Sequence, residues 1–275
     1  MKRAFRQVDV FSTTAYRGNP VAVVLEAEGL TTHQMQRFAN WTNLSETTFV
    51  LPPSEPGADY QVRIFTPDAE LPFAGHPTLG TCHAWLEFTG RLGMPRIAQQ
   101  CPAGVIELRS TPAGLAFKAP PLLREGPVDE ALTRQVATVL NIRRDEIVAA
   151  EWVDNGPGWL AVLLRDAKAV LALRPGRLEQ PIGAVGPYPA GAECAFEVRA
   201  FFPLQGATLE DPVTGSLNAS LGQWLVRSGR APAPYVVSQG TALGRAGRVH
   251  ISASEEGSIW VGGGTLTCIS GSVEI

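Results

Sequence analysis

Two stretches of this 275-residue chain, about 140 residues apart, follow the same order of features. Each begins at a strand end, F-T-P at 65–67 and F-F-P at 201–203, and passes through an acidic stretch and a small-residue loop into an amphipathic helix. Such an internal duplication predicts two similar halves with a ligand-binding cleft between them. Each helix start would offer free N–H groups and a positive dipole end to that cleft, which suits a carboxylate.

The length of the chain leaves room for two modest domains. Its 28 glycines and 22 prolines indicate many turns and therefore a strand-rich fold. The segment from about 119 to 127 is rich in proline and has little periodicity. It is the best candidate for the crossover between halves, so we expect domains at 1–118 and 119–261.

The balance of charge argues against several classes of partner. A net charge of −3 and a pI near 5.9 favour neither nucleic acid nor an anionic membrane surface. The basic N-terminus lacks the apolar region of a signal peptide, and no apolar run reaches the length of a membrane span. The cysteines show neither C-x-x-C nor zinc spacing, so we expect free thiols in a reducing cytoplasm; they are Cys82, Cys101, Cys194 and Cys268.

Local patterns predict most of the secondary structure. Strands are expected at 5–11, 20–25, 47–51 and 60–65, a helix at 129–141, and strands and hairpins after 246. Thr31 or Thr32 can cap a helix that ends near Asn43. A second helix should have Pro77 at its first position and Gly90 as its C-terminal cap.

Two residues of the first half could carry chemistry. Glu46 lies just past the first helix, where a carboxylate can reach a cleft and exchange a proton. The alternative is a surface glutamate near a helix end. His76 lies in a Gly-His-Pro loop at a helix start and could donate a hydrogen bond or relay a proton. Its alternative is a histidine that only satisfies local backbone groups.

The second half offers Asp211 and Ser216. Asp211 precedes a helix start and could serve the helix dipole or face the polar groups of a substrate. Ser216 lacks the G-x-S-x-G frame of a nucleophile elbow and suits a helix-start hydrogen-bond donor better. No nucleotide fingerprint, phosphate loop or metal-ligand spacing is found. We therefore expect no cofactor, which leaves proton transfer, hydrolysis or simple binding.

Several blocks in order resemble the phenazine-biosynthesis (PhzF-like) family. They are VDVF…GNPVAVV (8–24), NLSETTFVL (43–51), FTPDAELPFAGHPTLGT (65–81), R-x-F-x-P (199–203), EDPVTGS (210–216) and SQGTALGR (238–245). The resemblance covers nearly the whole chain. It implies an α+β fold similar to diaminopimelate epimerase, with two pseudo-symmetric halves, each a β-barrel-like sheet around a central helix. It also implies that the final strands, 262–275, return to the first half, and that the protein is a homodimer.

The resemblance also implies roles for particular residues. Glu46, His76 and Asp211 match the family's catalytic residues. Positions that hold the substrate are matched by Ser45, Gly75, Gly215, Ser216 and Gln239. The implied activity is the isomerisation of trans-2,3-dihydro-3-hydroxyanthranilate, in which a proton leaves C3 and returns at C1. One carboxyl group that alternates between base and acid meets that need.

Epimerases of this fold use two cysteines, one at each helix start. Here neither helix start holds a cysteine, and Cys82 lies inside its predicted helix, so two-thiol racemisation is disfavoured. Our leading hypothesis is a cofactor-free isomerase acting on a small carboxylate, with a substrate that differs from the phenazine precursor. The alternatives are a racemase or epimerase of an amino-acid-like substrate and a non-catalytic binding protein.

Overall fold

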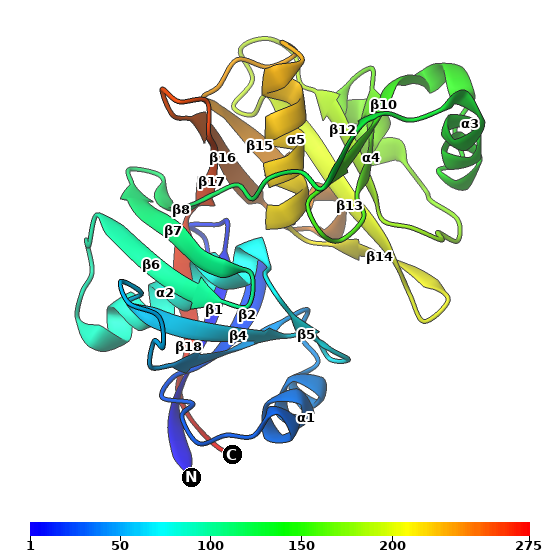
Figure 1. Cartoon of the computed structure of the whole chain (residues 1–275). Coiled ribbons are helices and arrows are strands. Elements are labelled where there is room, and N and C mark those ends of the chain that lie inside the picture. Colours follow the sequence, from blue (N-terminus) through cyan, green and yellow to red (C-terminus); the bar gives the residue numbers. More distant parts are fainter. The chain divides into compact units, whose positions relative to one another are not determined.

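The computed structural model describes residues 1–275 and divides into two compact units (Figure 1). Unit 1 comprises residues 1–118 together with 262–275, and unit 2 comprises residues 119–261. No helix in either unit has both the length and the apolar character that crossing a bilayer requires.

Unit 1 is a curved sheet with two helices. Its elements are β1 (Lys2–Val10), β2 (Asn19–Val24), α1 (Thr32–Thr42), β3 (Thr47–Leu51), β4 (Tyr60–Phe65), β5 (Glu70–Leu71), α2 (Gly75–Thr89), β6 (Arg96–Cys101), β7 (Gly104–Thr111), β8 (Gly114–Lys118) and β18 (Thr265–Glu274). The strands pair in the order β18-β1-β2-β3-β4-β6-β7-β8, with β5 also on β4. Only β2–β3 and β4–β6 are parallel.

Helix α2 is the core of unit 1. It contacts β1, β2, β3, β6, β8 and β18, and Figure 1 shows it among the strands of unit 1. Nearly every position from Gly75 to Leu86 is buried, so the helix is buried on all sides rather than along one stripe. Close packing leaves no room at Gly80, where a Cβ would lie 2.3 Å from Val21 Cγ1.

Unit 2 has the same plan with additions. Its elements are β9 (Arg124–Pro127), α3 (Glu130–Val139), the 3₁₀ turn η1 (Arg144–Glu146), β10 (Ile147–Asp154), β11 (Leu160–Leu164), α4 (Ala167–Ala172), β12 (Ile182–Pro187), β13 (Phe196–Leu204), β14 (Ala207–Asp211), α5 (Gly215–Arg227), β15 (Tyr235–Gln239), the 3₁₀ turn η2 (Thr241–Leu243), β16 (Gly247–Ala253) and β17 (Ile259–Gly263), which runs across the unit boundary. The strands pair in the order β9-β10-β11-β12-β13-β15-β16, with β14 on β13.

Strand by strand, the two units repeat one another. Strands β1 to β4 and β10 to β13 share an antiparallel, parallel, antiparallel sequence of pairings, with a helix before the third strand. A short strand and a buried helix follow in both units, and then a parallel return strand. The predicted α+β fold with two similar halves, each a sheet around a central helix, is therefore confirmed.

The duplication extends to one ion pair. Arg63 on β4 forms a bidentate contact with Glu70 on β5, with N–O distances of 2.7 and 2.6 Å. Arg199 on β13 makes the same contact with Glu210 on β14, at 2.9 and 2.7 Å. The second pair is more deeply buried, and Arg199 also donates to two backbone carbonyls.

Most helix ends lie at the residues that the sequence predicts. Thr31 is the N-cap of α1 and forms a capping box, and Asn43 and Gly90 close α1 and α2 in left-handed conformations. The placement of Pro77 is corrected, because α2 begins at Gly75 and Pro77 is its third residue. Proline is tolerated there because the first four helical N–H groups have no intrahelical acceptor. The segment 119–127 also contains a strand, β9, which its weak periodicity did not reveal.

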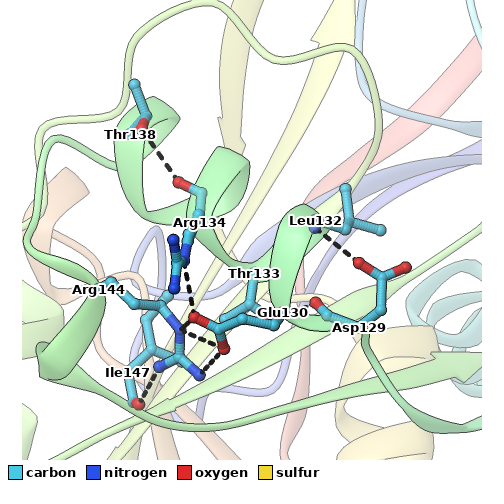
Figure 2. A network of polar contacts seen from close by, with 8 residues as sticks. All are labelled: Asp129, Glu130, Leu132, Thr133, Arg134, Thr138, Arg144 and Ile147. Atoms are coloured by element: carbon cyan, nitrogen blue, oxygen red, sulfur yellow. Dashed lines mark hydrogen bonds and ion pairs between the residues drawn. The ribbon is translucent and has the colours of Figure 1, made fainter.

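Three helices begin with a side-chain cap. Besides Thr31 on α1, Asp129 accepts from Leu132 N at 2.8 Å on α3, and Asp166 accepts from Ala169 N at 2.7 Å on α4. Figure 2 shows Asp129 at the start of α3, beside Glu130, whose carboxylate accepts hydrogen bonds from Arg134 and Arg144. The two central helices, α2 and α5, have no side-chain cap.

The two ion pairs should differ in their contribution to stability. Glu210→Gln leaves a nearly buried guanidinium without its carboxylate and should lower the free energy of unfolding by about 3 kcal/mol. Glu70→Gln alters a pair whose side chains are 21 and 27% exposed, against 6 and 11% for the other pair, and should cost about 1 kcal/mol. Urea unfolding of both variants measures the difference, and equal losses would contradict this interpretation.

Candidate active site

The connection between α1 and β3 holds Glu46 in place. Helix α1 ends at Asn43, which takes a left-handed conformation and donates its N–H to Ala39 O. Thr42 Oγ1 and Thr47 Oγ1 lie 2.9 Å apart and join the two ends of the connection. The chain therefore turns within three residues, Leu44 to Glu46, and β3 begins immediately afterwards. The side chain of Glu46 is 16% exposed.

Glu46 contacts His76, the second residue of α2. Glu46 Oε2 lies 3.4 Å from His76 Nε2. The other ring nitrogen, Nδ1, lies 3.4 Å from the side-chain nitrogen of Asn19, the first residue of β2. The imidazole is thus held between two side chains from different elements, and it is buried.

Burial determines the charge of His76. Removal from solvent lowers the pKa of the ring from 6.5 to about 3, although a nearby Pro20 backbone carbonyl favours the charged form. The ring is therefore neutral at pH 7, and its contact with Glu46 is between a carboxyl group and a neutral imidazole rather than an ion pair. A neutral imidazole carries one N–H donor and one acceptor, and can hydrogen-bond a carboxyl group in either protonation state.

The start of α2 is suited to an anion. Its N-cap, Ala74, has no side-chain acceptor for the helix N–H groups, and Gly75 has no side chain to cover them. At this end of the helix the N–H of Thr78 donates to Ala74 O at 3.2 Å. The backbone N–H groups of Gly75 and His76 precede it, at the positive end of the helix dipole.

In unit 2, Gln239 organises the start of α5. Its side-chain oxygen accepts from Thr214 N at 3.1 Å and from Asn218 Nδ2 at 2.7 Å, and its side-chain nitrogen donates to Thr214 Oγ1 at 2.9 Å. Thr214 Oγ1 donates in turn to Asp211 Oδ2 at 2.6 Å. Because Gln239 is fully buried and these bonds occupy its amide, the structure gives it a bracing role beside the predicted substrate-binding one.

Ser216 is held from a second direction. It is the second residue of α5, the position that His76 has in α2. Trp159 Nε1 donates to Ser216 Oγ at 3.1 Å, and Asn155 Nδ2 donates to Ser216 O at 3.0 Å. The serine hydroxyl proton can still be donated, since the tryptophan bond uses only an acceptor lone pair.

The predicted site residues thus form one group within each unit. Glu46, Gly75 and His76 lie together in unit 1, with Ser45 exposed beside Glu46. In unit 2 the predicted residues at the start of α5 are Asp211, Gly215, Ser216 and Gln239.

Sequence reasoning missed the residues that hold these groups, above all Asn19, Thr214 and Trp159. The GNP and DPVTGS blocks contained the first two, but spacing gave no sign of what their side chains contact.

The cysteines lie apart from both helix starts. Cys82 is in the interior of α2, fully buried, and burial raises the pKa of its thiol to about 12. None of the four cysteines forms a disulfide. No cluster of three or more His, Cys, Asp or Glu side chains is arranged to hold a metal ion.

Fold and site define an α+β protein built from two repeated units, with a carboxyl–imidazole pair at one central helix start. Residues 8–271 match the PhzC-PhzF family model, described as phenazine biosynthesis-like protein. The chain belongs to this family.

Curated relatives and a solved structure agree with this assignment. The chain is 37% identical to antisense-enhancing sequence 1 of Schizosaccharomyces pombe over 98% of both chains. It is 35% identical to trans-2,3-dihydro-3-hydroxyanthranilate isomerase of Pseudomonas fluorescens over 86% of both. A PhzF-family protein of Bacillus anthracis, 22% identical, superposes over the full length of both chains with a TM-score of 0.83, which shows the shared fold. The protein is accordingly an isomerase of this family.

The buried neutral His76 should make stability depend on pH. Between pH 6.5 and about 3 the unfolded chain binds a proton at this ring that the folded chain does not, so the free energy of unfolding falls as the pH falls through that window. From pH 7 to pH 5 the loss from this group should be about 2 kcal/mol. Above pH 6.5 it should make no contribution.

Urea unfolding at the two pH values tests this expectation. Burial also lowers the pKa of His83 and His250, so the wild type must be compared with His76→Asn, which retains both. The variant should lose about 2 kcal/mol less than the wild type. An identical pH dependence in the two proteins would show that His76 is not buried as a neutral ring.

Proposed function

We propose that the protein catalyses a cofactor-independent proton transfer on a small carboxylate-bearing substrate, with Glu46 as the proton carrier. The observation that supports this most directly is the 3.4 Å contact between Glu46 Oε2 and His76 Nε2. It lies at a helix start whose N-cap offers no side-chain acceptor. A carboxyl group that moves a proton and a set of donors that receive an anion are the two components such a reaction needs.

The proton carrier works as both base and acid. The Glu46 carboxylate removes a carbon-bound proton, the electron pair shifts through the adjacent double bond, and the Glu46 carboxylic acid returns the proton to a second carbon on the same face. His76 remains neutral throughout, and its Nε2 atom, 3.4 Å from Glu46 Oε2, can hydrogen-bond the carboxyl group in either of the carboxyl group's protonation states. No proton is gained or lost overall.

The substrate is a small organic acid. The family relatives include an enzyme named for trans-2,3-dihydro-3-hydroxyanthranilate, which makes that compound the first probe to test. Gly75 and Ser45 contribute to holding the substrate beside Glu46. Asp211, held through Thr214, also takes part in catalysis. Substrate-binding roles in unit 2 fall to Gly215 and Ser216, and Gln239, predicted to bind substrate, supports them by holding Thr214 at the start of α5.

The proposal includes the compartment and the oligomeric state of the protein. The protein works in the cytoplasm as a homodimer. Four cysteines without a disulfide fit a reducing compartment, and the resemblance to the family supports the dimer.

Glu46→Gln should abolish turnover and leave binding intact. Glutamine keeps the shape and a hydrogen-bonding group but cannot carry a proton, so the rate should fall about 1,000-fold. The measurement follows deuterium entering trans-2,3-dihydro-3-hydroxyanthranilate from heavy water by mass spectrometry, with binding measured by calorimetry. Glu55→Gln, at an exposed glutamate, is the matched control and should keep the wild-type rate. Substantial exchange by the Glu46 variant would rule out this role.

A racemase or epimerase is the second candidate function. Its two-thiol mechanism can be distinguished from the first candidate by the reactivity of the cysteines. A two-thiol enzyme should lose activity when its cysteines are alkylated. Here Cys82 is buried with a raised pKa, and burial also raises the pKa of Cys101 and Cys194. Treatment of the folded protein with iodoacetamide should therefore leave the deuterium-exchange rate unchanged, with the extent of alkylation read by mass spectrometry. Loss of exchange in step with alkylation would favour the thiol mechanism.

A further inference from the structure

A buried aspartate braces the loop that leads to the active site in unit 1. Asp9, near the end of β1, is 2% exposed. Its Oδ2 atom accepts hydrogen bonds from the backbone N–H groups of Arg17, at 2.8 Å, and Gly18, at 2.9 Å. Both donors belong to the loop 11–18, which joins β1 to β2. The carboxylate thus fixes the last turn of this loop.

The loop needs such a brace because its backbone is strained. Phe11 and Tyr16 have φ values of 64° and 67°, in the left-handed region that side chains with a Cβ rarely occupy. Gly18 has no room for a side chain, since a Cβ there would lie 2.1 Å from Val10 O. A loop of this kind keeps its shape only when the surrounding structure over-determines it.

The next residue after the braced turn contacts the active-site imidazole. Asn19 is fully buried, and its side-chain nitrogen lies 3.4 Å from His76 Nδ1. The opposite ring nitrogen faces Glu46. Any shift of the turn at Gly18 therefore moves the Asn19 side chain, which holds one side of the imidazole. The His76 ring, and with it the contact to Glu46, would move as well.

Unit 2 repeats this device with different side chains. Asp154, at the end of β10, accepts from Gly156 N at 2.7 Å and from Gly158 N at 2.6 Å. The braced loop 155–159 then delivers the side chains of Asn155 and Trp159 to Ser216. The helix residue that is held is again the second residue of the central helix.

We propose that Asp9 and Asp154 are positioning residues: each braces a loop between two strands that orients the second residue of the adjoining central helix, His76 in unit 1 and Ser216 in unit 2. This inference rests on the proposed function for its effect on turnover, but not for the positioning itself. It assigns a role to two aspartates outside the catalytic and binding groups described above.

Nuclear magnetic resonance of the imidazole nitrogens tests the positioning without any substrate. The chain has four histidines, and the signals of His76 are identified by their loss in His76→Asn. In ¹⁵N-labelled Asp9→Ala at pH 7 the His76 ring signals should shift and broaden, because the ring is no longer held on its Asn19 side. Asp129→Ala is the matched control: it also removes one aspartate that accepts from a backbone N–H, at the start of α3, and should leave the His76 signals at their wild-type positions.

Asp9→Asn provides a second variant in case Asp9→Ala does not fold. Asparagine keeps the shape and one acceptor oxygen, and should give a smaller shift of the same signals. Unchanged His76 signals in folded Asp9→Ala, or equal shifts in the Asp129 control, would overturn the inference.

Kinetics with trans-2,3-dihydro-3-hydroxyanthranilate distinguish the two loops. Asp9→Ala should lower kcat by about 100-fold with little change in KM, because it misplaces the partner of the proton carrier. Asp154→Ala should chiefly raise KM, because it releases a substrate-binding serine. The same change in both variants would contradict separate positioning roles. Absence of turnover in the wild type would overturn the proposed function on this compound, while the resonance measurement would still decide the positioning of His76 by Asp9.

Discussion

The structure depends on enclosing an uncapped helix start within each sheet. A helix leaves its first N–H groups without acceptors, and elsewhere in this chain a threonine or aspartate side chain satisfies part of that need. At α2 and α5 the N-caps make no such bond. Surrounding strands bury both helices almost completely, so the donors at their starts keep a fixed direction.

The same burial sets the chemistry at Glu46. A histidine on the surface would be partly charged near neutral pH and would form an ion pair with a carboxylate. Within unit 1 the loss of solvent lowers the pKa of His76 and holds the ring neutral, so the ring does not take up a proton near neutral pH. In the proposed mechanism the proton therefore stays with the Glu46 carboxyl group and the substrate.

The two units share their strand framework but differ in the side chains at their central helix starts. Both units keep the arginine–glutamate pair that joins the fourth strand to its short neighbour. They differ at the second residue of the central helix, where one has His76 and the other Ser216. They also differ at the residue before the third strand, where Glu46 precedes β3 and Pro181 precedes β12. Only one unit thus has an ionisable side chain at this position, which agrees with a single proton carrier.

The sequence by itself determined the repeated plan, most helix ends and the family. These follow from local properties: apolar periodicity, threonine and glycine caps, and motif blocks such as GNP and FAGHP. The sequence did not predict short or weakly patterned elements such as β9 and α4, because their backbone pairing and packing depend on residues distant in the chain.

Only the tertiary structure brought Glu46 to His76, because the two residues are 30 positions apart along the chain and three strands, β3 to β5, lie between them. It also decided that His76 is neutral and that Asp9 braces the loop to Asn19, since burial and side-chain contacts exist only once the strands enclose the helix.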